Sequence, residues 1–248
     1  MITYKIKKVL PDEILSEMGR LNKINIFAVF VVLGVILLLT GCRKKSERSS
    51  VSFSKKTVVH HENKVIKDCD YTFQEAVAGC NAPSRILNEL ELINVRYYST
   101  DGKIHEGQLL TNKNIAGDLK DIFDSVLRYK FPVKQVVPVV KYGWDDDLSM
   151  ADNNTYSFCY RNVDFSKHAY GMAVDINPFF NPVRWKYPYS LHHANKPGGA
   201  VRDTTRNGTF YAGHPLVELF RKKGFRWGHT FTQKFDDHHF EKRNRYIY

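Results

Sequence analysis

A histidine and a carboxylate at a fixed interval mark one short segment of the chain, SKHAYGMAVDINP at residues 166–178. His168 stands seven residues before Asp175, and both residue types bind zinc in proteins. Two ligands of one tetrahedral zinc ion have donor atoms roughly 3.4 Å apart. Seven residues span about 10.5 Å of helix or roughly 20 Å of strand, and on a strand the odd interval separates the two faces. A shared metal therefore requires a bend between them, which Gly171 permits. The simpler alternative is a strand edge with a surface histidine.

A third ligand must come from another part of the chain, and the sequence DDHHFE at residues 236–241 offers one. His239 lies three residues after Asp236, so a single helical turn would project both side chains to one side. Zinc held by three protein ligands keeps one position for water, and a nearby carboxylate can act as general base. Asp236 is the expected base, with Asp237 as the alternative.

The elements that must position these residues do not follow a regular β-α-β alternation, and the chain has no internal repeat. We therefore expect an α+β domain. Apolar periodicity and turn residues predict helices at 71–80, within 83–92, at 115–129 and at 215–223, and strands at 93–99, 107–112, 133–142 and 169–177. Residues 143–154 and 178–214 are rich in turn-forming residues and are predicted to be long loops.

The N-terminal region has the pattern of an export signal. Residues 26–39 read IFAVFVVLGVILLL and are followed by Thr40-Gly41-Cys42. Fourteen apolar residues fit a signal-peptide core better than a membrane span, which needs about 20. The segment resembles the lipobox of bacterial lipoproteins, so residues 1–41 are predicted to be the signal peptide and Cys42 the lipidated residue. The alternative is an uncleaved single-span anchor.

The net charge of +11 is unevenly distributed. Residues 43–56, RKKSERSSVSFSKK, carry six basic and one acidic side chain and have little to bury. We expect residues 42–64 to be a flexible tether near anionic lipid and residues 65–248 to be the folded domain. No nucleic-acid-binding motif accompanies the charge, so nucleic acid is not an expected partner.

Cysteines give one further prediction. Cys69 and Cys80 lie eleven residues apart at the start of the folded region, and such a pair in an exported protein can form a disulfide. Cys159 has no obvious partner and is expected to be a buried thiol.

Two separated motifs resemble the M15 family of zinc peptidases. SKHAYGMAVD fits the family pattern S-x-H-x-x-G-x-A-x-D, and GFRWGHTFTQKFDDHHFEK at 224–242 is similar to the family ending G-F-x-W-G-G-x-W…D-x-x-H-F-E. The family includes D-Ala-D-Ala carboxypeptidases and dipeptidases and L-Ala-D-Glu endopeptidases that act on cell walls. The resemblance implies a small antiparallel sheet with flanking helices and long loops, an architecture that the hedgehog signalling domain shares.

The resemblance also implies roles for individual residues. The implied zinc ligands are His168, Asp175 and His239. Asp236 is the implied base, and Arg161 the arginine that stabilises the oxyanion. Ser166 resembles a substrate-contacting serine, and Trp227 is either core or pocket wall. The chain departs from the family pattern at His229 and Phe231, which alters the surroundings of the site without removing a ligand.

These features together predict a lipid-anchored, zinc-dependent peptidase that cuts peptidoglycan stem peptides. The bond cut, of D-Ala-D-Ala carboxypeptidase or L-Ala-D-Glu endopeptidase type, stays open. The alternative is a catalytically inactive, zinc-containing module that binds the cell wall. The expected location is the cell envelope, facing the periplasm or the exterior, and the expected state is a monomer.

Overall fold

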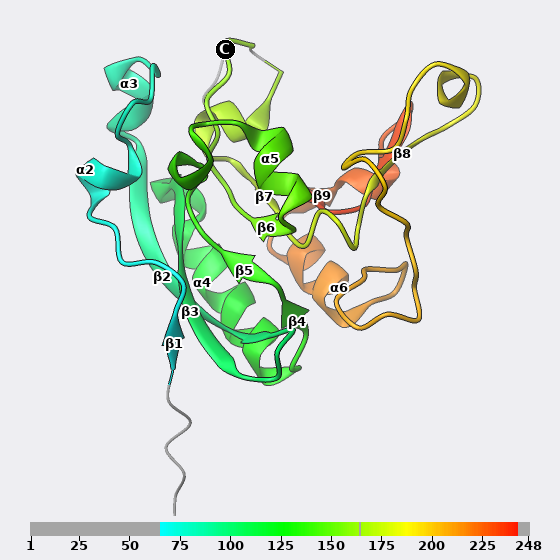
Figure 1. Cartoon of the computed structure of the whole chain (residues 1–248), viewed down its shortest axis with the longest axis horizontal. Helices are drawn as coiled ribbons and strands as arrows, with labels where there is room; N and C mark the ends of the chain where they lie inside the picture. The colour runs from blue at the N-terminus through cyan, green and yellow to red at the C-terminus, as the bar shows by residue number, and fades with distance from the viewer. Residues whose placement is uncertain (1–64, 164, 243–248) are drawn as a thin grey trace, which may run out of the picture. The chain divides into compact units, whose positions relative to one another are not determined.

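A long hairpin and the helix that follows it organise the domain (Figure 1). Strands β2 (Leu90–Ser99) and β3 (Ile104–Asn112) pair antiparallel, and helix α4 (Lys113–Arg128) begins directly after β3. Asn112 caps the helix, because its side chain accepts a hydrogen bond of 3.0 Å from the Asn114 N–H. The buried face of α4 repeats every three or four residues and packs against β2 and β3.

The structure is a computed structural model and describes residues 65–163 and 165–242. The predicted signal peptide, the lipidation of Cys42 and the tether lie outside the described residues. In the described part of the chain, no helix combines the length and apolar character needed to cross a membrane.

Two larger sheets, of four and three strands, and two two-stranded sheets make up the described part of the domain. The hairpin sheet has the order β1-β3-β2-β4, with β1 (Ile66–Lys67) and β4 (Pro132–Val133) parallel at its edges. The second sheet has the order β7-β11-β9 and is antiparallel, formed by β7 (Ala173–Asp175), β11 (His239–Lys242) and β9 (Phe225–Trp227). The remaining elements are α2 (Phe73–Ala76), α3 (Ser84–Leu87), β5 (Gln135–Val136), η1 (Val139–Tyr142), α5 (Asp146–Ala151), β6 (Asn154–Thr155), η2 (Lys167–Tyr170), β8 (Val183–Trp185), η3 (Tyr189–Leu191), α6 (Pro215–Lys222), η4 (Gly228–Thr230) and β10 (Lys234–Asp236).

One apolar core joins the two sheets through α4 and α6. Phe240, in the middle of β11, has no exposed surface and stacks on Phe220 of α6 with ring centroids 3.9 Å apart. Phe210 contacts the Phe240 ring edge-on, with ring centroids 5.1 Å apart. The side chains on either side of Phe240 must therefore point away from the core, because side chains alternate along a strand.

The expected α+β class is confirmed, and the helices predicted at 115–129 and 215–223 are α4 and α6. The loop predicted at 143–154 is wrong in part, because it contains α5, which Asp145 caps by accepting a hydrogen bond from the Leu148 N–H. The strand predicted at 169–177 shortens to β7, because η2 extends through Tyr170. The strand predicted at 133–142 is wrong in its second half: it breaks after Val136 and becomes the short helix η1. Pro138 interrupts it because proline has no N–H to donate to a sheet, and it precedes η1 at the N-cap position. The helices predicted at 71–80 and within 83–92 shrink to one turn each, since β2 already begins at Leu90.

The predicted disulfide is absent, because Cys69 and Cys80 are both free thiols in the structure. Cys69 Sγ lies 3.8 Å from the Val136 carbonyl oxygen, whereas Cys80 packs against the small cluster around Ala76 and Ile86. Burial raises the pKa of Cys69 to about 11, so this thiol stays protonated at neutral pH. Cys159 is buried, as expected.

Candidate metal centre

A sharp bend at Gly171 separates His168 from Asp175. His168 lies on η2, Gly171 follows with φ 63° in the left-handed region, and β7 then carries Asp175. A Cβ at Gly171 would lie 2.7 Å from the Asn112 backbone nitrogen, so no other residue fits without displacing the hairpin. The Gly171 carbonyl oxygen accepts hydrogen bonds from Asn112 N–H and Thr111 Oγ1, which fixes the bend against β3.

His239 reaches the same place through strand pairing. It lies directly opposite Asp175 in the antiparallel β11–β7 pair. Three donor atoms then form a nearly equilateral triangle: His168 Nε2 to His239 Nδ1 is 3.0 Å, His168 Nε2 to Asp175 Oδ1 is 3.1 Å, and His239 Nδ1 to Asp175 Oδ1 is 2.9 Å. All three residues are at most 7 % exposed. We call these atoms the donor triangle.

The hydrogen bonds behind the donor triangle set the tautomers of both histidines. His168 Nδ1 donates to the Ser157 carbonyl oxygen at 2.7 Å, which leaves a lone pair on Nε2. His239 Nε2 faces Glu241 Oε2 at 3.3 Å, which leaves a lone pair on Nδ1. Two imidazole lone pairs and a carboxylate oxygen therefore face one point, an arrangement that needs a cation.

Without a metal ion, the carboxylates around the donor triangle favour a proton on His239, in the position that a metal ion would otherwise take. Burial disfavours the charged form of His239, yet Asp175, Glu241 and Asp236 outweigh it and raise its pKa to about 10. Burial also opposes ionisation of Asp175, but the imidazoles of His168, His238 and His239 hold its pKa well below its usual range. A proton can satisfy only one edge of the triangle, whereas a divalent metal ion satisfies all three donors. The residues fit zinc, which binds imidazole nitrogen and carboxylate oxygen at three protein positions with a fourth left open.

Asp236 lies beside the donor triangle as a buried carboxylate. Its Oδ2 pairs with Lys234 Nζ at 2.8 Å, and its Oδ1 lies 3.0 Å from His238 Nε2. That second contact lacks hydrogen-bond geometry, so Oδ1 has no hydrogen-bond partner among the described residues. Burial opposes ionisation, but His238, His239 and Lys234 together lower the pKa of Asp236. The carboxylate is ionised at neutral pH and has an oxygen free to accept a proton.

The predicted single turn between Asp236 and His239 is wrong. Asp236 ends β10, His239 begins β11, and a two-residue turn at 237–238 joins the strands. The turn still leaves the two residues close together, since both Cβ atoms lie next to Gly228 and the charge of His239 lowers the pKa of Asp236. His238 turns inward within it, donating from Nδ1 to the Asn181 carbonyl oxygen at 2.7 Å.

Asp237, the alternative base, belongs to a separate set of ion pairs. It is fully buried, and its Oδ2 lies 2.9 Å from Arg184 Nη2 and 3.0 Å from Arg202 Nε. Its Oδ1 lies 2.5 Å from His229 Nδ1. We call Asp237 and these three partners the Asp237 cluster. All of its carboxylate contacts are supplied by the protein itself, so Asp236 is the carboxylate left to act at the triangle.

The other predicted site residues lie further from the donor triangle. Arg161 pairs with Asp146 at 2.6 Å and not with a triangle residue, although Asp175 is close enough to contribute to its raised pKa. Ser166 precedes η2 without capping it and is nearly buried. Trp227 is buried in the core, where its Nε1–H donates to the Asp237 carbonyl oxygen at 2.9 Å.

Sequence reasoning missed three residues that support the site: Ser157, Glu241 and Lys234. Glu241 was recognisable in principle, because it follows His239 by two residues on a strand and so shares its face. Ser157 acts through its backbone carbonyl, which leaves no signal in residue type.

Comparison with protein families supports the chemistry that the geometry indicates. Residues 161–242 match the model of a peptidase M15 family described as D-alanyl-D-alanine carboxypeptidase. This segment is similar to the M15 peptidases. It contains the whole donor triangle, Asp236 and the Asp237 cluster. No curated protein and no solved structure matches the chain.

Proposed function

We propose that the protein is a zinc metallopeptidase that hydrolyses peptide bonds in peptidoglycan stem peptides. The observation that carries the proposal is the convergence of His168 Nε2, His239 Nδ1 and Asp175 Oδ1, with edges of 2.9–3.1 Å, beside an ionised Asp236. The M15 match supports the peptidase class, and its description supports D-Ala-D-Ala carboxypeptidase activity as one of the two open specificities. L-Ala-D-Glu endopeptidase activity is the other.

Zinc, when bound, supplies Lewis acidity toward a water molecule and the scissile carbonyl. In the proposed mechanism Asp236 Oδ1 accepts the proton of the attacking water and later passes it to the leaving amine. Lys234 and His238 hold the Asp236 carboxylate in place. Glu241 and the Ser157 carbonyl oxygen keep both imidazoles oriented.

Arg161 is proposed to stabilise the oxyanion. For this, its guanidinium group must either release Asp146 or contact Asp146 and the substrate at the same time. Its side chain keeps 38 % exposure, so substrate can reach it. Ser166 remains a proposed substrate contact. Trp227 is proposed to act indirectly, through its hydrogen bond to the Asp237 carbonyl oxygen.

An inactive cell-wall binding module is the second candidate. A module that only binds has no need for a buried carboxylate with an unpartnered oxygen next to the metal ligands, and Asp236 is such a carboxylate. The peptidase is therefore the better-supported proposal. We further propose that a lipid on Cys42 holds the protein as a monomer at the envelope, facing the periplasm or the exterior.

The test is cleavage of purified muropeptides by the full-length protein, with products identified by mass spectrometry, in zinc and in chelator. We expect zinc-dependent release of either D-Ala or the stem peptide. Asp236→Asn should lower kcat by about 10²–10⁴-fold, the usual worth of a general base, while leaving zinc affinity close to wild type. Absence of cleavage on every stem peptide would leave the binding module as the function. Wild-type turnover by Asp236→Asn would remove Asp236 from the mechanism even if the peptidase class held.

A further inference from the structure

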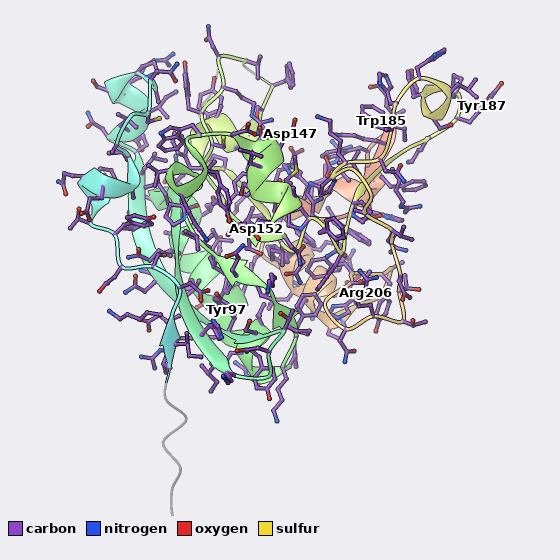
Figure 2. The ribbon with its side chains drawn as sticks, viewed as in Figure 1. Tyr97, Asp147, Asp152, Trp185, Tyr187 and Arg206 are labelled. Carbon is purple, nitrogen blue, oxygen red and sulfur yellow. The ribbon has the colours of Figure 1, made fainter. Side chains whose placement is uncertain are left out.

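A groove remote from the donor triangle has a lining of unusual charge. Two hollows of about 530 and 400 Å³ meet at Lys130, Pro132, Arg206 and Asn207, which line both. None of the lining residues is aspartate or glutamate, and none belongs to the donor triangle or the Asp237 cluster. We call this the Lys130–Arg206 groove. Figure 2 shows Arg206 in the loop next to α6, well away from Asp147 at α5.

The two cations of the groove are held on aromatic faces. The Arg206 guanidinium lies 4.9 Å from the centre of the Phe180 ring, and the Lys130 ammonium lies 5.8 Å from the centre of the Tyr98 ring. Neither forms an ion pair with a carboxylate in the described part of the chain, and the charge of Arg206 reaches Asp203 only at longer range. Both positive charges are thus available to a ligand.

Further hydrogen-bond donors line the larger hollow. Thr209 is part of its wall, although the hydroxyl itself is buried and has no hydrogen-bond partner among the described residues. His214 Nδ1 accepts from the Leu216 N–H at 3.2 Å, so its ring proton is on Nε2 and is available for donation. His214 also caps the N-terminus of α6, the end at which the helix dipole favours negative charge.

The loop that carries Arg206 and Thr209 is firmly positioned. The Gly208 carbonyl oxygen between them accepts hydrogen bonds from Asn177 Nδ2 at 3.1 Å and Asn181 Nδ2 at 3.0 Å. A Cβ at Gly208 would lie 2.8 Å from the Pro132 carbonyl oxygen, so the loop packs directly on β4. The donors are therefore fixed before any ligand arrives, which lowers the entropic cost of binding.

We propose that the Lys130–Arg206 groove binds a ligand through a phosphate ester. A phosphate offers enough acceptor oxygens for an ammonium, a guanidinium and an imidazole N–H at once, and the guanidinium fork matches its geometry. The aromatic walls formed by Tyr98, Phe180 and Tyr211 provide surface for the uncharged remainder of the ligand. The proposal does not rest on the peptidase function, because the groove and the donor triangle share no residue.

The test is a calorimetric titration of the full-length protein with inorganic phosphate, and separately with glycerol 3-phosphate, at constant ionic strength. We expect saturable binding that weakens about a hundredfold in Lys130→Gln/Arg206→Gln, since two charged hydrogen bonds worth about tenfold each are lost. The matched control is Arg85→Gln/Lys222→Gln, which removes the same charge from exposed positions outside the groove and should leave binding unchanged.

Three results would overturn the proposal. Equal weakening in the control variant would mean that phosphate responds only to net charge. Undiminished binding in Lys130→Gln/Arg206→Gln would place the phosphate elsewhere, including on a zinc ion at the donor triangle. Tighter binding of acetate than of phosphate would assign the groove to carboxylates. Glycerol 3-phosphate and free phosphate separate an ester site from a site for the free ion.

Discussion

The donor triangle and the Asp237 cluster each contain a buried carboxylate, but the groups that stabilise its negative charge differ. Asp237 receives two guanidinium groups and an imidazole from the protein itself. Asp175 pairs only with imidazoles among the described residues, and these rings can release their protons. A buried carboxylate with permanent cations is a structural element, whereas one paired only with imidazoles can exchange their protons for a metal ion.

The comparison makes its largest prediction at a ligand of the donor triangle. His168→Ala should weaken zinc binding by more than the 10–100-fold typical of outer partners, because a donor atom itself is lost. In chelator, its free energy of unfolding should fall by only about 1–2 kcal/mol, since a buried ring and its hydrogen bond to Ser157 are lost but no permanent cation is removed. Zinc titration by calorimetry and denaturant unfolding in chelator measure the two quantities. His192→Ala, on an exposed loop, is the control, and unchanged zinc affinity in His168→Ala would refute the assignment of this ligand.

The reverse outcome is expected at the Asp237 cluster. Asp237→Asn should lower the free energy of unfolding in chelator by roughly 3 kcal/mol, because it leaves buried cations without their anion. Zinc affinity of the folded protein should change little. Arg221→Gln removes one partner of an exposed pair and should cost less than about 1 kcal/mol. A loss of zinc affinity without a loss of stability would show that the two regions are not distinct.

A smaller effect is expected behind the donor triangle. Glu241→Gln should weaken zinc binding by about tenfold, since a neutral amide accepts the His239 Nε2–H less strongly than a carboxylate does. Competition for zinc with a chromophoric chelator measures the change. The exposed carboxylate of Glu218 provides a matched control as Glu218→Gln, and equal affinities in both variants would exclude Glu241 from the site.

The smallest effect concerns a partly exposed ion cluster, in which Asp118 contacts Lys223 and Lys242. Burial opposes ionisation of Asp118, but the two lysines lower its pKa below the ordinary value of 3.8. Its contribution is therefore present above that value and is lost as the pH falls through the lowered pKa. Asp118→Asn should cost about 1 kcal/mol at pH 7 and almost nothing near pH 2, as measured by urea unfolding. A cost that is the same at both pH values would contradict the charge-based account.

The sequence allowed the donor triangle to be predicted better than its surroundings. The interval between His168 and Asp175 suits neither helix nor strand, so a shared metal required a bend, and the structure has it at Gly171. The helix at 113–128 was predictable because its apolar residues repeat with the helical period. These features depend on residues that are close in sequence or on one strong motif.

Features that depend on distant residues could not be predicted. Asp237 and Arg184 are 53 residues apart, and nothing in either local sequence indicates the other. His229, which stands where the M15 pattern has glycine, is explained only by this cluster, because its Nδ1 contacts Asp237 Oδ1. Arg161 was expected at the oxyanion on motif grounds, but motif spacing does not reveal its pairing with Asp146.

Strand β11 carries His239, a donor of the triangle, and Glu241, the partner of its other ring nitrogen, on either side of the fully enclosed Phe240 ring. A one-residue slip of β11 would bury His239 and Glu241 and expose Phe240, so the register that fills the core is also the register that builds the donor triangle. Selection for a stable core therefore preserves the site without acting on its chemistry. A relative that loses its ligands can keep this fold, whereas one that loses Phe240 is expected to lose both.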